Sequence, residues 1–360
     1  MVAIDRRFWN RKRVLITGHT GFKGSWLSLC LKARGAELFG YALAPPSEPS
    51  LFDLADVGRQ LTSVTGDIRD YKLLHDRIAD WRPEIVFHLA AQSLVRRSYQ
   101  DAVETYSTNV LGTVHLLEAV REACDDCVVV NVTSDKCYEN MEWARGYRED
   151  DRLGGRDPYS SSKACAELVT AAYRNAYFSQ TGPNRRRVGL ASARAGNVIG
   201  GGDWAEDRLV PDCIRALSAG RAVEVRNPTA FRPWQHVLEP LGGYLLLAER
   251  LWSDPDRFAR AWNFGPSDDD AWPVHRVVDR VIALWGGGSG METAPGENPY
   301  EAHHLKLDCS LARSELDWQP RTDLGTGLQW TVSWHRRVHA GEDPATVTRE
   351  QIEQFFRGST

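Results

Sequence analysis

The sequence lacks a long apolar run, a strong excess of charge and a disulfide pattern. Residues 1–13 are charged and lead directly into the short apolar run 14–16, so we expect neither a signal peptide nor a transmembrane helix. The formal net charge of −4 gives no electrostatic reason to expect nucleic acid or an anionic membrane as the main partner. The seven cysteines are an odd number, and the lone CxxC formed by Cys124 and Cys127 has no second pair at the spacing of zinc ligands. We therefore expect a cytoplasmic protein with free thiols.

What the sequence does contain is a regular alternation of strand and helix patterns. Short apolar runs predict strands at 13–17, 37–41, 61–65, 85–89, 127–132 and 188–193, and helical patterns lie between them at 21–35, 70–81, 103–123 and 159–178. This alternation is typical of a doubly wound parallel sheet, a Rossmann-like α/β fold that binds ligands at the carboxyl ends of its strands. After Gly196, glycine and proline become frequent. We therefore predict one domain over residues 1–195, with a return segment near 231–265, and a smaller, interleaved C-terminal α/β domain over 196–360 that binds the substrate.

A glycine-rich turn separates the first predicted strand from the first helix. Its glycines have the spacing GxxGxxG, which permits a tight turn and lets a diphosphate approach the free N–H groups of a helix N-terminus. The turn therefore predicts dinucleotide binding, and the alternative is a glycine-rich turn without a ligand. The residues assigned to the cofactor here are Gly18, Thr20, Gly21, Phe22, Lys23 and Gly24.

The region expected to hold the adenosine half of the cofactor is less informative. Residues 40–45, at the end of the second strand, contain neither an acid nor a base, so they do not decide between NAD and NADP. Asp67, followed by Ile68, is predicted to contact the adenine edge; the alternative for Asp67 is the N-cap of the next helix. After the fourth strand, Leu89, Ala90, Ala91 and Gln92 leave room for the cofactor.

Tyr159 and Lys163 lie four residues apart and so share one helix face. An ammonium group beside a phenol favours the phenolate, and we expect Lys163 to lower the pKa of Tyr159 in this way. The phenolate can accept the proton of a sugar hydroxyl while a hydride leaves for a nicotinamide. Together with Ser134 upstream, Tyr159 and Lys163 predict an enzyme that oxidises a sugar hydroxyl.

Asp135 and Lys136 follow the fifth strand directly. The carboxyl end of a parallel strand faces the ligand crevice, so this acid and amine are predicted to work on the same ligand as Tyr159. The alternative is an ion pair within a surface loop.

These motifs stand in the order used by the extended short-chain dehydrogenase/reductase superfamily, which the chain resembles over nearly its whole length. Within the branch that acts on nucleotide sugars, residues 17–26, 133–138, 194–204 and 232–240 resemble the CDP-D-glucose 4,6-dehydratase family. The resemblance implies a lyase that converts CDP-D-glucose into CDP-4-keto-6-deoxy-D-glucose and water, with tightly bound NAD regenerated in each turnover. It also implies a cofactor role for Asn109, and a homodimer built on residues 103–123 and 159–178, with further association to a homotetramer left open.

The resemblance also implies a division of work among the catalytic residues. Oxidation at C4 must come first because only a ketone there makes the C5 proton acidic. Tyr159 would take the 4-hydroxyl proton with support from Lys163 and Ser134. Asp135 would then protonate the departing 6-hydroxyl while Lys136 removes the C5 proton. Other sugar-nucleotide 4,6-dehydratases carry Asp-Glu where this chain has Asp135-Lys136. A lysine base requires burial or a nearby cation such as Lys163 to lower its pKa.

The remaining predictions concern the substrate. Arginine suits phosphate groups, and the residues assigned to the diphosphate, cytosine and sugar are Gln92, Arg96, Asn197, Arg208, Arg232, His236 and Tyr300. For residues 232–236 the alternative is a proline-stiffened core turn, and for Arg96 a solvated helix face. The pair His303-His304 has no third ligand at suitable spacing, so we expect no metal. The competing functions are a nucleotide-sugar 4-epimerase, a dehydratase of another nucleotide hexose, and a non-catalytic dinucleotide-binding module.

Overall fold

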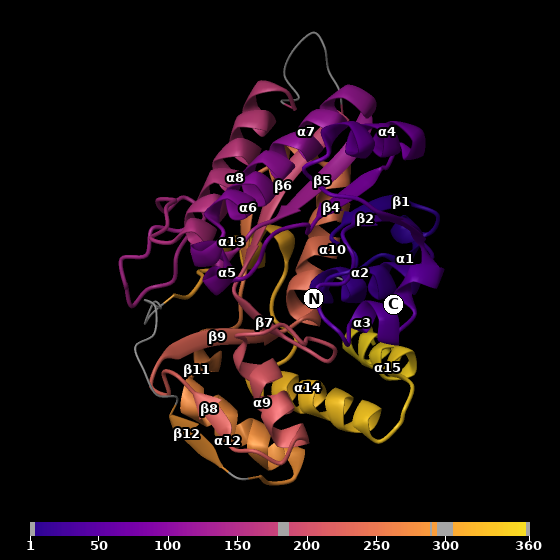
Figure 1. Ribbon diagram of the computed structural model, residues 1–360. Helices are drawn as coiled ribbons and strands as arrows, with labels where there is room; N and C mark the ends of the chain where they lie inside the picture. The colour runs from indigo at the N-terminus through magenta and orange to yellow at the C-terminus, as the bar shows by residue number, and fades with distance from the viewer. Residues whose placement is uncertain (1–3, 179–186, 289, 294–304, 358–360) are drawn as a thin grey trace.

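The computed structural model describes residues 4–178, 187–288, 290–293 and 305–357, and its centre is a seven-stranded parallel sheet (Figure 1). The strand order β10-β6-β5-β4-β1-β2-β3 reverses direction between β1 and β4, which is the switch point where a doubly wound sheet binds its ligand. Six of the seven strands are almost fully buried because their apolar side chains are covered on both faces. The strands are β1 (Arg13–Thr17), β2 (Glu37–Ala42), β3 (Thr62–Thr65), β4 (Ile85–His88), β5 (Asp126–Val132), β6 (Arg187–Ala195) and β10 (Ala261–Phe264).

Helices cover both faces of this sheet. On one face lie α2 (Phe22–Lys32) and α10 (Leu238–Ser253), whose apolar side chains share the largest hydrophobic core. On the other face lie α4 (Tyr71–Trp81), α7 (Gly112–Ala123) and α8 (Pro158–Ala176), over a second core. The predicted fold class is confirmed. The predicted helix 103–123 differs from the structure, which has α6 (Ala102–Tyr106), a π-helical turn (Ser107–Leu111) and then α7.

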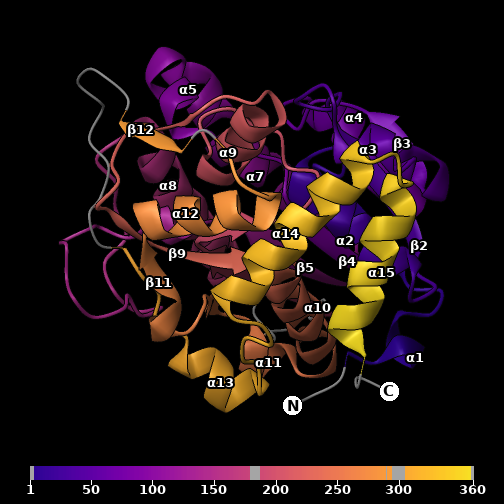
Figure 2. The ribbon, with the colours of Figure 1, turned by 90° about the horizontal axis from the view of Figure 1, so that it is seen from below.

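A smaller part lies below the carboxyl edge of the sheet in the view of Figure 1 and has its own hydrophobic core; Figure 2 shows it from below, in front of the sheet. It contains a three-stranded sheet of β7 (Asn197–Ile199), β9 (Phe231–His236) and β11 (Ala271–Pro273), and a two-stranded sheet of β8 (Val223–Val225) and β12 (Met291–Thr293). Its helices are α9 (Leu209–Ser218), α12 (Val274–Trp285) and α14 (Leu324–His339).

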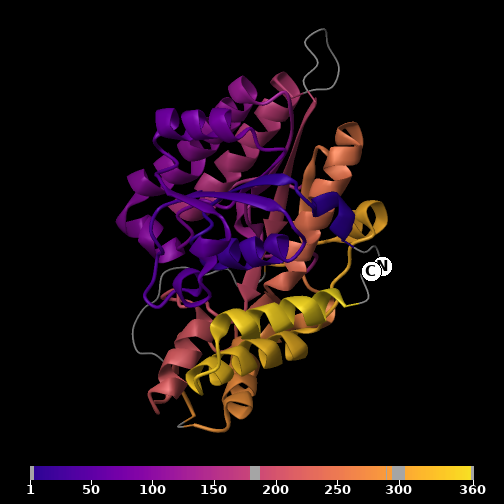
Figure 3. The ribbon, with the colours of Figure 1, turned by 90° about the vertical axis from the view of Figure 1, so that its right-hand side faces the viewer.

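Besides α13 (Ser310–Leu316), which packs on α10 and β10, two segments return to the large part. The first is α10 followed by β10, which joins the main sheet beside β6. Within the predicted return segment 231–265, β9 instead pairs with β7 and β11 in the small sheet, so the return begins at Leu238. The second is α15 (Pro344–Phe356), which packs on α2 and α3 (Leu51–Leu54) because its buried face joins the main core (Figure 3).

The other short elements connect these layers. They are α1 (Arg6–Trp9), α5 (Val95–Gln100), α11 (Pro255–Phe258), α13 (Ser310–Leu316), and 3-10 turns at Val57–Gln60, Asp135–Cys137 and Asp268–Asp270.

Within the described ranges, no helix combines the length and the apolar character needed to cross a membrane. Those ranges also contain no group of three or more His, Cys, Asp or Glu side chains that could hold a metal ion.

Candidate active site

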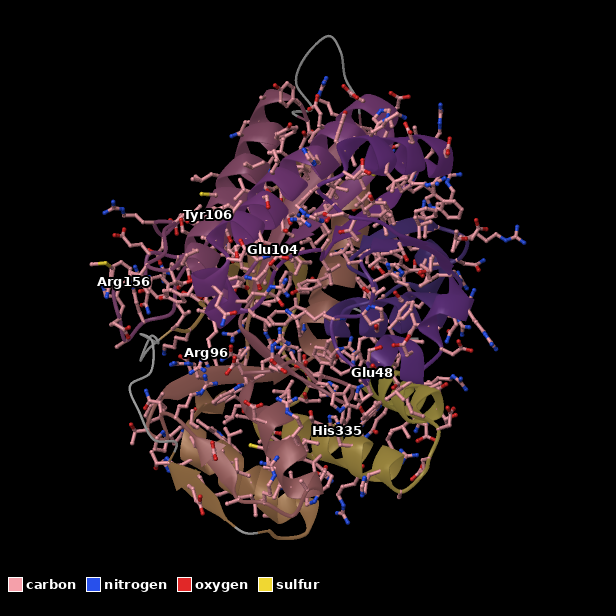
Figure 4. All side chains as sticks on the ribbon, viewed as in Figure 1. Glu48, Arg96, Glu104, Tyr106, Arg156 and His335 are labelled. Atoms are coloured by element: carbon pink, nitrogen blue, oxygen red, sulfur yellow. The ribbon has the colours of Figure 1, made fainter. Side chains whose placement is uncertain are left out.

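A cavity of about 1850 Å³ separates the carboxyl edge of the main sheet from the smaller part. It is lined by the turns that follow β1, β2, β3, β4 and β5, and from the other side by β7, β9 and α9. Pockets for a single small ligand are typically about 300–1,000 Å³, so this cavity has room for two ligands of nucleotide size. Figure 4 shows Arg96 close to the boundary between the two parts and Glu48 on the other side of the view.

The glycine turn after β1 is held tightly against β4. Gly18 has a φ of +77°, and a Cβ there would lie 2.7 Å from the backbone N of Ala90. A Cβ at Gly24 would lie 2.1 Å from the Gly18 carbonyl oxygen, so the turn tolerates no larger residue at either position. Gly21 is the N-cap of α2, and no side chain caps the helix there. The first N–H groups of α2 therefore face the cavity beside Gly21 and suit the diphosphate of a dinucleotide.

The far end of the cavity, beside β2 and β3, contains Asp67 and Ile68 as predicted. Arg69 binds the Asp67 carboxylate through Nε, 2.9 Å from Oδ1, and that hydrogen bond holds the pKa of Asp67 below its usual value. The N-cap of α4 is Asp70, whose carboxylate accepts a hydrogen bond from the backbone N of Leu73. The alternative assignment of Asp67 as that N-cap is therefore wrong.

Tyr159 and Ser134 both line the opposite end of the cavity. Burial raises the pKa of the Tyr159 phenol, and the Lys136 cation together with the polar Ser134 hydroxyl act against it. Lys163, predicted to support the Tyr159 phenolate, lines the cavity together with Tyr159 and Lys136. Burial lowers the pKa of Lys163 to about 8. The negative charge of Glu167, one helical turn further along α8, acts in the opposite direction and raises it.

The segment Ser134–Lys136 forms a compact turn directly after β5. The Ser134 hydroxyl donates to Asp135 Oδ1 at 3.0 Å and accepts from the backbone N of Lys136 at 3.2 Å. Lys136 Nζ lies 3.5 Å from Asp135 Oδ1, and the Asp135 side chain is 3% exposed. A Cβ at Gly196 would lie 3.0 Å from Asp135 Oδ2, so a glycine there leaves space for the carboxylate.

The five predicted catalytic residues therefore face one cavity, namely Ser134, Asp135, Lys136, Tyr159 and Lys163. A phenol, a hydroxyl, a carboxyl and two amines in one enclosed site can both remove a hydroxyl proton and exchange protons with a neighbouring carbon and oxygen.

A buried network behind these residues was missed by the sequence analysis. Glu167 accepts hydrogen bonds from Thr133 Oγ1 at 2.5 Å and Ser192 Oγ at 2.7 Å, and its Oε2 lies 2.7 Å from Arg194 Nη2. Arg194 also donates to the Tyr138 hydroxyl at 2.7 Å. The network thus ties α8 to the ends of β5 and β6. The available signal was the spacing of Glu167, four residues after Lys163 on the same helix face.

On the opposite wall, Arg96, Asn197, Arg208 and Arg232 all line the cavity. Arg208 Nη1 lies 3.0 Å from Asp203 Oδ2, and the Asp203 charge raises the pKa of Arg208. Arg96 lies 3.2 Å from Asp207 Oδ1, which also binds Arg226 at 3.3 Å. Arg226, another cavity residue, was missed because it stands in no motif of the sequence.

The substrate predictions for residues 232–236 and for Tyr300 were not confirmed. His236 is 1% exposed and packs between the rings of Trp26 and Trp330, so it does not line the cavity and the prediction that it binds substrate is wrong. Its apolar neighbours, rather than a ligand, fix its position. The alternative of a core turn for 232–236 is also wrong, because the segment is the strand β9. Tyr300 lies outside the described residues.

Gln92 and Asn109 both have hydrogen-bond partners within the protein, and Gln92 lines the cavity. The Gln92 amide N donates to Leu94 O and to Thr105 Oγ1, both at 3.0 Å, so both of its amide hydrogens are used within the protein. Asn109 is 2% exposed, accepts from the backbone N of Gln92 at 2.9 Å, and donates to Ser162 Oγ at 2.8 Å. Asn109 therefore clamps the turn after β4 to α8 and does not itself line the cavity.

Comparison with known proteins gives matches over most of the chain. The family model "GDP-mannose 4,6 dehydratase" matches residues 15–251. The chain is 52% identical over 357 residues to CDP-glucose 4,6-dehydratase of Salmonella typhimurium, with 99% of each chain covered. It is 28% identical to UDP-glucose 4-epimerase of Mycolicibacterium smegmatis, with 90% of this chain and 98% of that one covered.

Among solved structures, the chain is similar to a dTDP-glucose 4,6-dehydratase from Streptomyces venezuelae with NAD and TYD bound, with a TM-score of 0.77 and 24% identity. The superposition covers 92% of this chain and 99% of that one. UDP-glucose 4-epimerase from Thermotoga maritima with UDP-glucose has a TM-score of 0.77 at 20% identity, covering 91% and 99%. These structural similarities show the fold.

Proposed function

Since the chain belongs to the GDP-mannose 4,6-dehydratase family, we propose that it is an NAD-dependent CDP-glucose 4,6-dehydratase. The reaction converts CDP-D-glucose into CDP-4-keto-6-deoxy-D-glucose and water. One observation carries the proposal: the Asp135–Lys136 pair faces the same cavity as Tyr159 and Ser134. A 4-epimerase needs the phenol but no acid and amine for C5 and C6. The 52% identity to the Salmonella enzyme over the whole chain supports CDP-glucose as the substrate.

The residues of the large part suit NAD. The free N–H groups of the α2 N-terminus would hold its diphosphate, and Asp67 and Ile68 would hold the adenine. Leu89, Ala90 and Ala91 leave room along the floor of the cavity, and Lys163 would hold the nicotinamide ribose. When bound, NAD supplies the acceptor for a hydride from the sugar and returns that hydride later in the same turnover. The cofactor is therefore retained and regenerated.

The first task of the protein is to remove the proton of the 4-hydroxyl. Tyr159 accepts it as a phenolate, and Ser134 donates a hydrogen bond to the oxygen that becomes the ketone. The position of the Tyr159 phenol and the Ser134 hydroxyl in one cavity supports these roles, and the Lys136 cation favours the phenolate. The product of this step is a ketone at C4, which makes the neighbouring C5–H acidic.

The second task is to remove water across C5 and C6. Lys136 takes the C5 proton, the C–H electrons form the double bond, and Asp135 gives a proton to the departing hydroxyl. An ion pair and a neutral acid–amine pair have the same net charge and differ only in which partner holds the proton. The 3.5 Å separation of Lys136 Nζ and Asp135 Oδ1 allows that exchange within the pair. Lys136 afterwards returns a proton to C5.

The wall formed by the smaller part binds the nucleotide. Arg96, Arg208 and Arg232 are proposed for the diphosphate because a guanidinium presents several donors to phosphate oxygens, and Asn197 is proposed for the sugar or the cytosine. In this division, the dinucleotide binds to the part formed by residues 1–195 with the returning segments 238–264 and 344–356. The nucleotide sugar binds to the part formed by the other residues after 195.

A substrate panel tests the proposal. CDP-, dTDP-, UDP- and GDP-glucose are incubated with NAD+ and the purified chain, and 4-keto-6-deoxy products are quantified. CDP-glucose is expected to be preferred. Preference for another nucleotide would leave the dehydratase chemistry standing and refute the specificity. A product epimerised at C4 would favour the epimerase, and no conversion of any sugar would favour a binding module.

We also propose that the chain forms a homodimer through α6 and α8. Apolar side chains are exposed together on these helices and on the adjoining segments, with Val103 81% exposed; the others are Tyr99, Tyr106, Leu111 and Leu168. Figure 4 shows Tyr106 on this outer side of the large part. Paired α-helices in a second copy would cover this surface. Val103→Asp is expected to lower the molar mass measured by light scattering to that of a monomer; an unchanged mass would refute this interface.

A further inference from the structure

A glycine lies beside the proposed acid of the elimination, where the chain passes from the large part to the smaller one. Gly196 stands between the last residue of β6 and the first residue of β7, and it lines the cavity together with Asp135. A Cβ at this position would lie 3.0 Å from Asp135 Oδ2 and 3.6 Å from the carbonyl oxygen of Pro233 on β9. A side chain at position 196 would therefore meet the carboxyl that the proposed elimination uses.

The two oxygens of the Asp135 carboxyl have different surroundings. The Ser134 hydroxyl donates to Oδ1 at 3.0 Å, and Lys136 Nζ lies 3.5 Å from that same oxygen. Among the described residues, no donor forms a hydrogen bond with Oδ2, whose neighbour is Gly196. Oδ1 thus serves contacts within the protein, and Oδ2 is the oxygen that remains for a hydroxyl of the substrate.

The backbone does not require a glycine at position 196. Gly202, further along the same connection, has a φ of +77°, whereas the φ of Gly196 lies outside this positive range and suits other residues. The space beside Oδ2 is what a larger residue would change. A hydroxyl must approach a carboxyl oxygen to about 2.5–3.0 Å to form a hydrogen bond. A carbon atom 3.0 Å from Oδ2 would cover part of that approach.

We propose that Gly196 is a positioning residue for the loss of water, because its lack of a side chain leaves Asp135 Oδ2 open to the departing 6-hydroxyl. The inference rests on the proposed function. In this step Oδ2 gives its proton to the 6-hydroxyl, the C6–O bond breaks and water leaves. The C5–H electrons form the C5–C6 double bond, and Lys136 takes the C5 proton. The oxidation at C4 does not use Oδ2, so the two steps should respond differently to a side chain at position 196.

The experiment compares wild type with Gly196→Ala and Gly196→Ser, after thermal unfolding has shown that each variant is folded. Stopped-flow absorbance measures reduction of the nicotinamide on addition of CDP-glucose, and NMR measures the 4-keto-6-deoxy product. We expect both variants to retain the wild-type rate of reduction. Product formation should fall by about 10–100-fold, because a displacement of about 1 Å at a reacting group can cost about 10²-fold.

Gly325→Ala is the matched control. Gly325 lies in α14 and does not line the cavity, and a Cβ there would lie 3.6 Å from Asp323 Oδ1, which is an ordinary contact. This variant adds the same methyl group to the chain and should have the wild-type rates of both steps.

A second sugar separates proton donation from other effects of the substitution. CDP-6-deoxy-6-fluoroglucose has the same ring and nucleotide, but fluoride leaves C6 with less need of a proton donor than hydroxide. The loss of product formation in Gly196→Ala should therefore be smaller with the fluoro sugar than with CDP-glucose, and Asp135→Asn should show the same pattern. A substitution that only disturbed the fold would slow both steps equally with both sugars.

Wild-type product formation by folded Gly196→Ala and Gly196→Ser would overturn the inference, as would an equal loss of both steps with both sugars. If neither variant folds, a crystal structure of wild type with NADH and CDP-glucose decides. The sugar O6 should lie within hydrogen-bond distance of Asp135 Oδ2, and O6 bound to Oδ1 instead would overturn the inference. These results leave the proposed function intact, because the substrate panel tests it separately. Absence of 4-keto-6-deoxy product from wild type with every sugar of that panel would overturn both.

Discussion

The amine of Lys136 lies 3.5 Å from Asp135 Oδ1, and the Ser134 hydroxyl donates to that same oxygen at 3.0 Å. Three adjacent residues thus connect the hydroxyl that serves the oxidation with the acid and the amine that serve the elimination. Since Ser134 and the Tyr159 phenol line the same cavity, both steps take place at one site. This arrangement explains how one site can oxidise a sugar and then remove water from it.

Replacement of Lys136 by methionine should separate the two steps. The variant retains Tyr159, Ser134 and Lys163, so we expect the nicotinamide to become reduced on addition of CDP-glucose while formation of the 6-deoxy product falls by about 10²–10⁴-fold. Single-turnover absorbance of the reduced nicotinamide and product analysis measure the two quantities. Lys72→Met, an exposed lysine of α4, is the control. Full dehydratase turnover by Lys136→Met would remove Lys136 from the role of base.

Tyr159→Phe should instead block the oxidation. Without the phenol no group takes the 4-hydroxyl proton, and reduced nicotinamide should form about 10²–10⁴-fold more slowly, which stopped-flow absorbance measures. Tyr177→Phe changes an exposed tyrosine at the end of the same helix and should have the wild-type rate. Rapid reduction in Tyr159→Phe would contradict the assignment.

Glu167→Gln should destabilise the fold and disturb Lys163. The variant leaves the buried Arg194 guanidinium without its carboxylate, and loss of one partner from a buried ion pair typically costs about 3–5 kcal/mol in the free energy of unfolding. Denaturant unfolding measures this change, and Glu315→Gln, which breaks an exposed pair with Arg257, should have little effect.

The double variant Glu167→Gln/Arg194→Met should recover part of the lost stability because it removes the unpaired charge. Equal stability of Glu167→Gln and wild type would show that the network does not stabilise the catalytic strand ends.

Glu249 should make the stability depend on pH. Its Oε1 accepts from Trp9 Nε1 at 2.6 Å and from the backbone N of Asp5 at 3.0 Å, and burial raises the pKa of this carboxyl to about 7. Because the pKa of Glu249 is higher in the folded than in the unfolded state, proton binding by this carboxyl stabilises the fold. Its contribution to the free energy of unfolding is fully present below about pH 4.5 and is lost as the pH rises through about 7.

The matched variant is Glu249→Gln, whose amide oxygen can accept both hydrogen bonds at any pH. Between pH 5 and pH 8, the Tm of wild type should fall relative to that of Glu249→Gln, while exposed Glu353→Gln should follow wild type. A constant difference between Glu249→Gln and wild type over this range would contradict the account.

The strand ends were the most predictable part of the site. A run such as 127–132 is apolar on both faces, so the sequence locates the strand, and the side chains just after it must reach the carboxyl edge. This is why Ser134, Asp135 and Lys136 were found together with Tyr159 and Lys163. The glycine turn was also recognisable, because the GxxGxxG spacing predicts dinucleotide binding when it lies between a predicted strand and a helix.

The sequence did not predict which side chains contact each other. The Asn109 amide binds the backbone of Gln92 and the Ser162 hydroxyl, which depends on how α8 packs beside the turn after β4. The Gln92 amide binds Leu94 and Thr105. His236 stands in a motif-like run, but β9 directs its ring into the core between two tryptophans.

The most direct test of the central claim follows the hydrogen atoms of the sugar. CDP-glucose labelled with deuterium at C4 is converted in ordinary water, and the product is analysed by NMR. The account predicts CDP-4-keto-6-deoxyglucose with the deuterium at C6 and a solvent proton at C5. Recovery of the label at C4 in an epimerised sugar, or its loss to solvent, would contradict the account.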